Sequence, residues 1–146
     1  MKPLGVNRVV IAVKDLDRAI QFYSRLLGAT FEDVSAGAEV FGVRAAISWD
    51  AGIELVAPLP GRDSAIARSI EKHGEGVRQI VFAVDDIEEA RARIEAMDIR
   101  ILETIEFSEK QLEHQFHGRF ARYKEHILHP GDTGGAPLII AQFNPR

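Results

Sequence analysis

The chain has 146 residues, of which 46% are hydrophobic and 27% charged, so it is long enough to form one globular domain with its own core. A net charge of −4 with interleaved acidic and basic residues argues against nucleic acid as a partner, and no apolar run is long enough to span a membrane. The absence of cysteine excludes disulfides, thiol catalysis and Cys metal ligands, and the lack of a signal-peptide core near the N-terminus favours a cytoplasmic protein.

The first predicted strand is the sequence VVIAV at residues 9–13, which is apolar at every position and therefore typical of a strand buried on both faces. Asp15 is expected to cap an amphipathic helix that ends at Leu27, with Gly28 as its C-terminal cap. Three extended segments follow, with the sequences ATFEDV, VFGVRAAISWD and GIELVAP. A linker helix is then expected near residues 63–73.

Residues 80–100 repeat the pattern of residues 9–29 without a gap, at an offset of 80 − 9 = 71. Asp86 and Glu89 have the spacing of a capping box, and three more extended segments follow: RILETI, RFARYKEHIL and APLIIAQF. The order strand, helix and three strands thus occurs twice. We expect an α+β fold in a single domain, 1–146, built from two tandem β-α-β-β-β modules, about 5–60 and 76–144, that form a curved mixed sheet around a cleft.

Three stretches carry a resemblance to a known family: IAVKDLDRAIQFYSRLLGA, GIELVAPLPGRDSAIARSIEKHGEGVRQIVFAVDDIEEA and LHPGDTGGAPLII. They resemble the vicinal oxygen chelate superfamily, which includes glyoxalases, bleomycin-resistance proteins and extradiol dioxygenases, and most closely its methylmalonyl-CoA epimerase branch. The resemblance covers most of the chain except about residues 104–118. It implies the vicinal oxygen chelate fold, a small-molecule ligand in the cleft between the modules, and a homodimer.

The resemblance also implies a divalent metal that takes one ligand from each of four strands, and this sequence departs from that pattern. The four positions hold Arg8, Glu54, Gln79 and Ile139. Arginine stays protonated and has no lone pair to give, and isoleucine has no donor atom. Glu54 is the one strong ligand that remains, so we expect no metal and no cofactor. The position of the family's second catalytic carboxylate is occupied by apolar residues, Val40 and Phe41.

Arg8 therefore stands where the metal would stand, and two interpretations of it remain open. In the first, Arg8 binds a carboxylate, phosphate or enolate-like oxygen of a ligand, and Glu54 orients it. In the second, Arg8 only neutralises Glu54 as a buried structural pair. Both predict a contact between Arg8 and Glu54. A tight pair would hold Glu54 ionised and make it a poor base near neutral pH.

Other candidate ligand-binding residues are Gln79, Trp49 and Tyr123, although aromatic residues in strands are commonly plain core. Four histidines, His114, His117, His126 and His129, are spaced in pairs and leave open a shifted metal site. The segment 106–118 is longer than the corresponding family connection and is expected to act as a lid or an interface.

Two functions follow from these residues. The first is a glyoxalase/bleomycin-resistance-like protein that binds a small anionic or acyl-type ligand without a metal. The second is an isomerase, epimerase or lyase acting on an acyl or acyl-CoA substrate, metal-independent or with a rearranged metal site. In that case Glu54 would be the general acid or base and Arg8 the electrophile.

Overall fold

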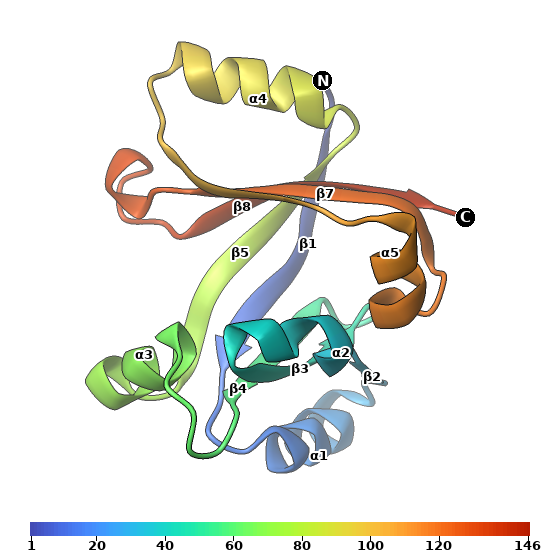
Figure 1. Ribbon diagram of the computed structural model, residues 1–146, viewed down its shortest axis with the longest axis vertical. Helices are drawn as coiled ribbons and strands as arrows, with labels where there is room; N and C mark the ends of the chain where they lie inside the picture. Colours follow the sequence, from blue (N-terminus) through green and yellow to red (C-terminus); the bar gives the residue numbers. More distant parts are fainter. The chain divides into compact units, whose positions relative to one another are not determined.

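The computed structural model describes all residues of the chain, 1–146, and divides them into two compact units. One unit is Arg8–Arg78, hereafter the N-unit, and the other joins Met1–Asn7 to Gln79–Arg146, hereafter the C-unit. Strands β1 (Pro3–Ala12) and β5 (Gly76–Val84), labelled in Figure 1, each contain residues of both units. None of the helices is both long and apolar enough to cross a membrane.

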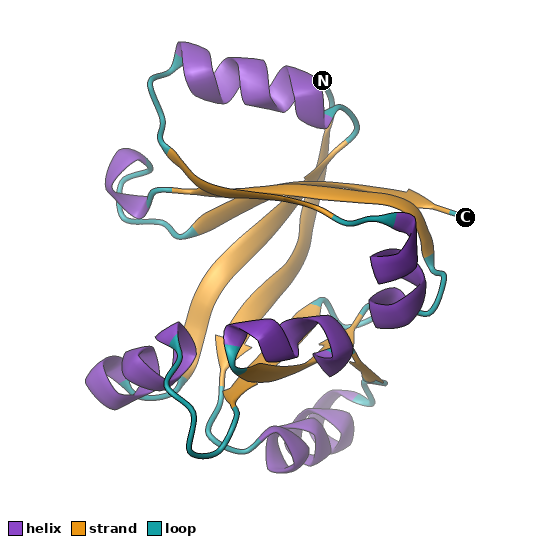
Figure 2. Cartoon of the chain, in the orientation of Figure 1, coloured by secondary structure: helices purple, strands orange, loops and turns teal.

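The N-unit contains a mixed sheet with helices, and its strand order is β2–β3–β4–β1. Strand β1 is parallel to β4, whereas β3 is antiparallel to both β2 and β4. Its other strands are β2 (Glu32–Asp33), β3 (Val43–Ser48) and β4 (Ile53–Pro58). Its helices, purple in Figure 2, are α1 (Leu16–Leu27), α2 (Ser35–Ala38), the short 3-10 helix η1 (Glu39–Phe41) and α3 (Ala65–His73).

Helix α1 begins and ends where the sequence predicts. The Asp15 side chain accepts a hydrogen bond from the Arg18 backbone N–H at 3.1 Å, and Gly28 has φ 67°, the left-handed conformation that glycine adopts without strain. The helix covers one face of the sheet, where the buried core consists of Val13, Leu16, Ala46, Ile53, Leu55 and Ala57. Because side chains alternate along a strand, Arg8 and Glu54 lie on the opposite face of the sheet.

The C-unit repeats this arrangement with the strand order β5–β8–β7–β6. Strand β5 is parallel to β8, and β6, β7 and β8 are antiparallel to one another in turn. Its elements are α4 (Ile87–Ala96), β6 (Ile101–Glu106), α5 (Glu109–Phe116), β7 (Phe120–Leu128), η2 (Pro130–Asp132) and β8 (Leu138–Pro145). Asp86 caps α4 by accepting from the backbone N–H groups of Glu88 and Glu89.

The two modules match in strand register as well as in sequence. In the N-unit Val10 pairs with Glu54, and in the C-unit Val81 pairs with Ile139. The paired positions on β1 and β5 differ by 81 − 10 = 71, the offset of the sequence repeat. The predicted α+β fold of two β-α-β-β-β modules is confirmed, and Ile139 is the structural counterpart of Glu54.

The segment 106–118 forms helix α5, an element that the sequence did not clearly predict. Ser108 and Gln111 make a reciprocal capping box at its start, and His117 ends it in the left-handed conformation with φ 54°. Leu112 and Phe116 are each only 2% exposed. The insertion is therefore a packed part of the C-unit.

Strand β7 carries a histidine that is buried on the α4 side of the sheet. His126 is fully buried; its Nδ1 lies 2.7 Å from Thr104 Oγ1, and its Nε2 has no hydrogen-bond partner. Burial lowers the pKa of His126, and the positive charges of Lys124 and Arg91 lower it further. The folded protein therefore favours the neutral imidazole of His126 more strongly than the unfolded chain does.

This buried imidazole predicts a specific acid sensitivity. A histidine with a lowered pKa binds its proton more readily in the unfolded chain, so its stabilising contribution is complete above pH ~6.5 and declines as the pH falls below that value. The free energy of unfolding should decrease there by up to about 1.4 kcal/mol per pH unit from this group. Denaturant unfolding at several pH values gives the slope of the free energy of unfolding against pH, which should be shallower for His126→Gln than for wild type. His114→Gln, at an exposed position of α5, should keep the wild-type slope.

Candidate functional site

Arg8 is a buried cation on the sheet face opposite α1. Its side chain is 4% exposed, and its Nη2 lies 3.5 Å from Oε1 of Glu54 on the adjacent strand β4. Glu54 itself is 19% exposed. The contact expected from the sequence is therefore present. Solvent reaches the Glu54 carboxylate, so this group can contact a ligand. Solvent does not reach the Arg8 guanidinium, so its positive charge is only weakly screened.

Trp49, which follows β3 directly, lies against the same guanidinium. The Arg8 Cζ is 5.6 Å from the centroid of the indole ring, within the range of a cation–π interaction. The indole Nε1 donates a hydrogen bond to Glu32 Oε2 at 3.1 Å. From the sequence, Trp49 was only a candidate ligand-binding residue, and Glu32 was not anticipated.

Strand register explains why Glu32 belongs to this group. Glu32 pairs with Ile47 on β3, Ile47 pairs with Glu54 on β4, and Glu54 pairs with Val10 on β1. Directly paired residues point to the same face, so the two carboxylates lie on one face, two strand spacings or about 10 Å apart. The alternation in ATFEDV indicates which residues share a face of the strand. Which of the two faces lies toward Arg8 depends on the paired strand, and the sequence does not give this.

The residues at the four family ligand positions do not fit a divalent metal. The N-unit supplies Arg8 and Glu54, and the C-unit supplies Gln79 and Ile139, which is 4% exposed. Hard divalent cations take several oxygen or nitrogen ligands, and here a guanidinium and an aliphatic side chain occupy two of the positions. Nowhere in the chain do three or more His, Cys, Asp or Glu side chains gather in a way that could hold a metal ion.

A buried carboxylate in the C-unit was also missed by sequence reasoning. Glu125 is 7% exposed, and its Oε2 accepts a hydrogen bond from the hydroxyl of Tyr123 at 2.8 Å. Tyr123 pairs with Phe143 and Glu125 with Ala141 on β8, whereas the intervening Lys124 points toward α4 and contacts Glu88. Tyr123 and Glu125 therefore lie on the face of the sheet away from α4.

Tyr123, a candidate ligand-binding residue or core residue from the sequence, is only 1% exposed. The Phe116 ring from α5 stacks on Tyr123 with 5.0 Å between centroids and 13° between planes. Phe107, Phe120 and Phe143 each make a T-shaped contact with the Tyr123 ring. Tyr123 is therefore the centre of an aromatic cluster that attaches α5 to the sheet of the C-unit.

The four histidines occupy separate environments and do not assemble a shifted metal site. His126 is buried beside Thr104, and the Nδ1 of His129 accepts a hydrogen bond from the Gly131 N–H at 2.9 Å, which fixes the turn at η2. His114 is exposed on α5, and His117 caps the end of that helix.

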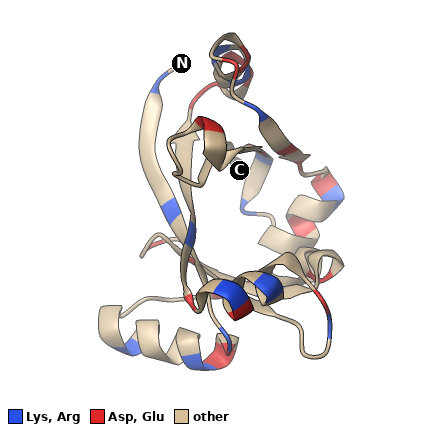
Figure 3. Cartoon of the chain, turned by 90° about the vertical axis from the view of Figure 1, so that its left-hand side faces the viewer, with Lys and Arg blue, Asp and Glu red and all other residues tan.

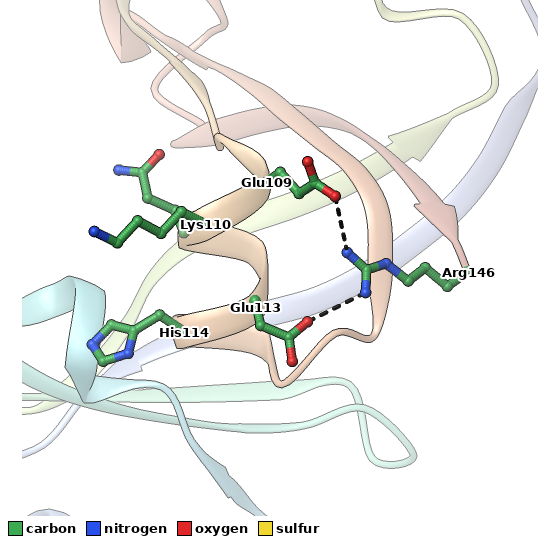
Figure 4. A pocket seen from close by; sticks show the side chains of 6 residues that line it. Glu109, Lys110, Glu113, His114 and Arg146 are labelled. Atoms are coloured by element: carbon green, nitrogen blue, oxygen red, sulfur yellow. Dashed lines mark hydrogen bonds and ion pairs between the residues drawn. The ribbon is translucent and has the colours of Figure 1, made fainter.

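The outer face of α5 borders a surface hollow of about 770 Å³, drawn in Figure 4. Glu109 and Glu113 point toward Arg146 and pair with it at 3.9 and 3.2 Å, while Lys110 and His114 project from the other side of the helix. Exposed ion pairs of this kind hold the last residues of the chain against α5. The hollow contains none of the residues around Arg8.

Charged residues of both signs are scattered over the chain, as the blue and red segments of Figure 3 show. Many form exposed pairs, such as Arg93 with Glu89 and Arg100 with Asp132. Arg8 differs from these in being buried. The group Arg8, Glu54, Trp49 and Glu32, all in the N-unit, is accordingly the candidate site.

Fold, repeat and ligand positions together define a class of protein. The model of the glyoxalase/bleomycin resistance protein/dioxygenase superfamily matches residues 7–121, and the chain belongs to this superfamily. Human mitochondrial methylmalonyl-CoA epimerase is 32% identical over 142 residues, which cover 94% of this chain and 73% of that protein.

Solved structures agree with this relationship. Methylmalonyl-CoA epimerase from Mycobacterium tuberculosis superimposes with a TM-score of 0.73 at 28% identity, covering 99% of this chain and 89% of that one. A methylmalonyl-CoA epimerase solved in complex with methylmalonyl-CoA and NH4+ gives a TM-score of 0.73 at 25% identity, covering 99% of this chain and 100% of that one. The predicted superfamily and its epimerase branch are both confirmed.

Proposed function

We propose that this chain is an isomerase-type enzyme that removes and returns a proton at the carbon next to the thioester carbonyl of an acyl-CoA. The observation that carries the proposal is the contact between buried Arg8 and Glu54, in a chain related over 94% of its length to an acyl-CoA epimerase. The relatives are enzymes, so they support this function better than the metal-free binding protein that the sequence favoured.

In this proposal the polar residues of the N-unit divide the chemistry between them. The Glu54 carboxylate takes the proton from the α-carbon, and the electron pair of the C–H bond forms the C=C bond of an enolate. The thioester oxygen gains the negative charge, and the guanidinium of Arg8 stabilises it by donating N–H groups. Return of a proton to the α-carbon uses the electron pair of the C=C bond and regenerates the thioester. The configuration inverts when the proton arrives at the face opposite to the one from which it left, whereas arrival at the same face gives exchange alone.

The arrangement suits this step for two physical reasons. Arg8 is 4% exposed, and a charge removed from water stabilises a developing anion more strongly than an exposed one. The 3.5 Å contact between Arg8 and Glu54 is longer than a close charge-assisted hydrogen bond of about 2.7–2.9 Å, so Glu54 is not the tightly paired carboxylate that would be a poor base. Glu54 is also 19% exposed, so its carboxylate remains accessible to a substrate. No step requires a metal, since Arg8 supplies the positive charge at the ligand position.

Proton exchange in deuterium oxide tests the proposal directly. Methylmalonyl-CoA incubated with the protein should gain deuterium at its α-carbon, measured by mass spectrometry against a protein-free sample. Glu54→Gln should slow the exchange by about 10²-fold or more, because it removes the base. Arg8→Met should slow it by about 10²–10³-fold, because it removes the oxyanion stabiliser. Glu71→Gln, at an exposed position of α3, should exchange at the wild-type rate.

Binding measured on the same samples separates the other outcomes. Trp49 is the single tryptophan, so its fluorescence reports ligand binding beside Arg8. Binding of methylmalonyl-CoA without exchange would favour the metal-free binding protein. The absence of both binding and exchange would refute an acyl-CoA function. Exchange that survives EDTA supports metal independence, whereas its loss in EDTA would indicate a rearranged metal site. The homodimer stays a prediction.

A further inference from the structure

We infer that Glu32 is a positioning residue, whose carboxylate holds the Trp49 indole against the Arg8 guanidinium and thereby fixes the cation of the candidate site. The catalytic consequence of this inference rests on the proposed function, whereas the structural arrangement does not. Glu32 belongs to none of the four family ligand positions, and nothing in the sequence motifs singles it out.

The indole of Trp49 is held at two places. Its Nε1, which is a donor only, gives its hydrogen bond to Glu32 Oε2 at 3.1 Å. Its ring lies 5.6 Å from the Arg8 Cζ. An aromatic ring carries negative charge on its face and positive charge on its edge, so a carboxylate at the edge and a cation near the face are each favourable.

The neighbouring acid on the same short strand shows that Glu32 has a particular role. Asp33 is exposed and accepts a hydrogen bond from the Ser35 N–H at 2.7 Å, which starts the turn into α2. Glu32 is half-buried and faces the same side of the sheet as Glu54, because both pair with Ile47. One acid therefore supports the local turn, and the other supports the indole beside Arg8.

The inference predicts how Arg8 behaves when Glu32 is changed. Without the carboxylate, Trp49 can rotate away, and the guanidinium loses one of its supports. A displaced catalytic group binds the substrate nearly as well but stabilises the transition state less. The kcat for α-proton exchange should therefore fall about tenfold in Glu32→Leu, with little change in KM.

Spectroscopy of the single tryptophan provides a test that needs no substrate. Glu32→Leu should weaken the near-UV circular dichroism of Trp49 and increase quenching of its fluorescence by acrylamide. Glu32→Gln keeps an acceptor oxygen, so it should retain most of the wild-type signal and recover much of the lost kcat. Glu71→Leu on α3 is the matched control and should change neither. Far-UV circular dichroism establishes that each variant is folded.

The outcomes separate the inference from the proposed function. A folded Glu32→Leu with wild-type tryptophan signals would overturn the inference, and so would an equal loss in Glu32→Leu and Glu32→Gln. In a double-variant cycle, Glu32→Leu should reduce kcat less when Arg8 is already Met, and equal reduction in both backgrounds would also overturn it. If the wild-type protein exchanges no proton, the proposed function fails, and the tryptophan signals alone decide whether Glu32 positions Trp49.

Discussion

Replacement of Arg8 by Met is expected to lower the free energy of unfolding by about 3 kcal/mol. The substitution keeps a long apolar side chain in the 4% exposed position but removes the cation 3.5 Å from Glu54. A carboxylate that is mostly withdrawn from water then loses its counter-charge, and the desolvation penalty of the carboxylate is no longer offset. Denaturant unfolding followed by far-UV circular dichroism measures the difference without relying on Trp49.

Removing the second charge should recover a large part of this loss. Glu54→Leu added to Arg8→Met replaces the ion pair by two apolar side chains, a change that is often neutral or even stabilising. The matched control is Arg100→Met, which breaks an arginine–carboxylate pair with Asp132 at a position where Arg100 is 64% exposed and should cost much less. A single variant as stable as wild type, or a double variant no more stable than the single one, would contradict the prediction.

The same double variant distinguishes the two interpretations of Arg8. The double variant lacks the proposed base, so ligand binding rather than exchange is the measurement that distinguishes them. If Arg8 serves only as the partner of Glu54, the folded double variant should bind methylmalonyl-CoA as wild type does. If Arg8 anchors the ligand, the double variant should fold and lose binding. Arg8→Lys should then also be impaired, because an ammonium cannot make the planar two-point contact of a guanidinium.

Replacement of Phe116 by Ala is expected to lower the free energy of unfolding by about 3–5 kcal/mol. Phe116 is 2% exposed and stacks on the Tyr123 ring, so its removal leaves a cavity between α5 and the sheet of the C-unit. The loss combines the apolar transfer energy of the ring with the contacts that the cavity forfeits. Denaturant unfolding measures the change.

Phe22→Ala on α1 is the matched control for this substitution. Phe22 is 56% exposed, so the same chemical change removes little buried surface and should cost far less. Equal losses in the two variants would show that α5 is not anchored through its aromatic cluster. In that event the lid or interface role predicted for segment 106–118 would remain open.

The repeat was readable from the sequence because its signals are local. The caps at Asp15, Gly28 and Asp86 depend on hydrogen bonds between residues two to four positions apart, and apolar periodicity depends on a single element. The equivalence of Arg8 with Gln79 followed from the offset of 71, and the strand registers of the two units repeat that offset. Local patterns thus determined the modules and the altered ligand positions.

Helix α5 and the buried carboxylates were less accessible to this reasoning. Helix α5 is short, and its stability comes largely from packing of Leu112 and Phe116 rather than from its own periodicity. Glu125 lies in a strand whose alternation could be assigned to either face until its pairing with β8 was known. Burial of an acid is costly, so sequence statistics place such residues at the surface.

The sequence by itself determined the duplicated α+β architecture, the superfamily and the presence of an arginine where a metal ligand would stand. Only the tertiary structure decided that Glu32, Trp49, Arg8 and Glu54 form one group, and that Tyr123 is covered by Phe116. The physical reason is that side-chain contacts between strands depend on register and pairing partner, which join residues far apart in the chain. Local propensities determine that a segment forms a strand. The neighbouring strand with which it pairs determines which side chains it contacts.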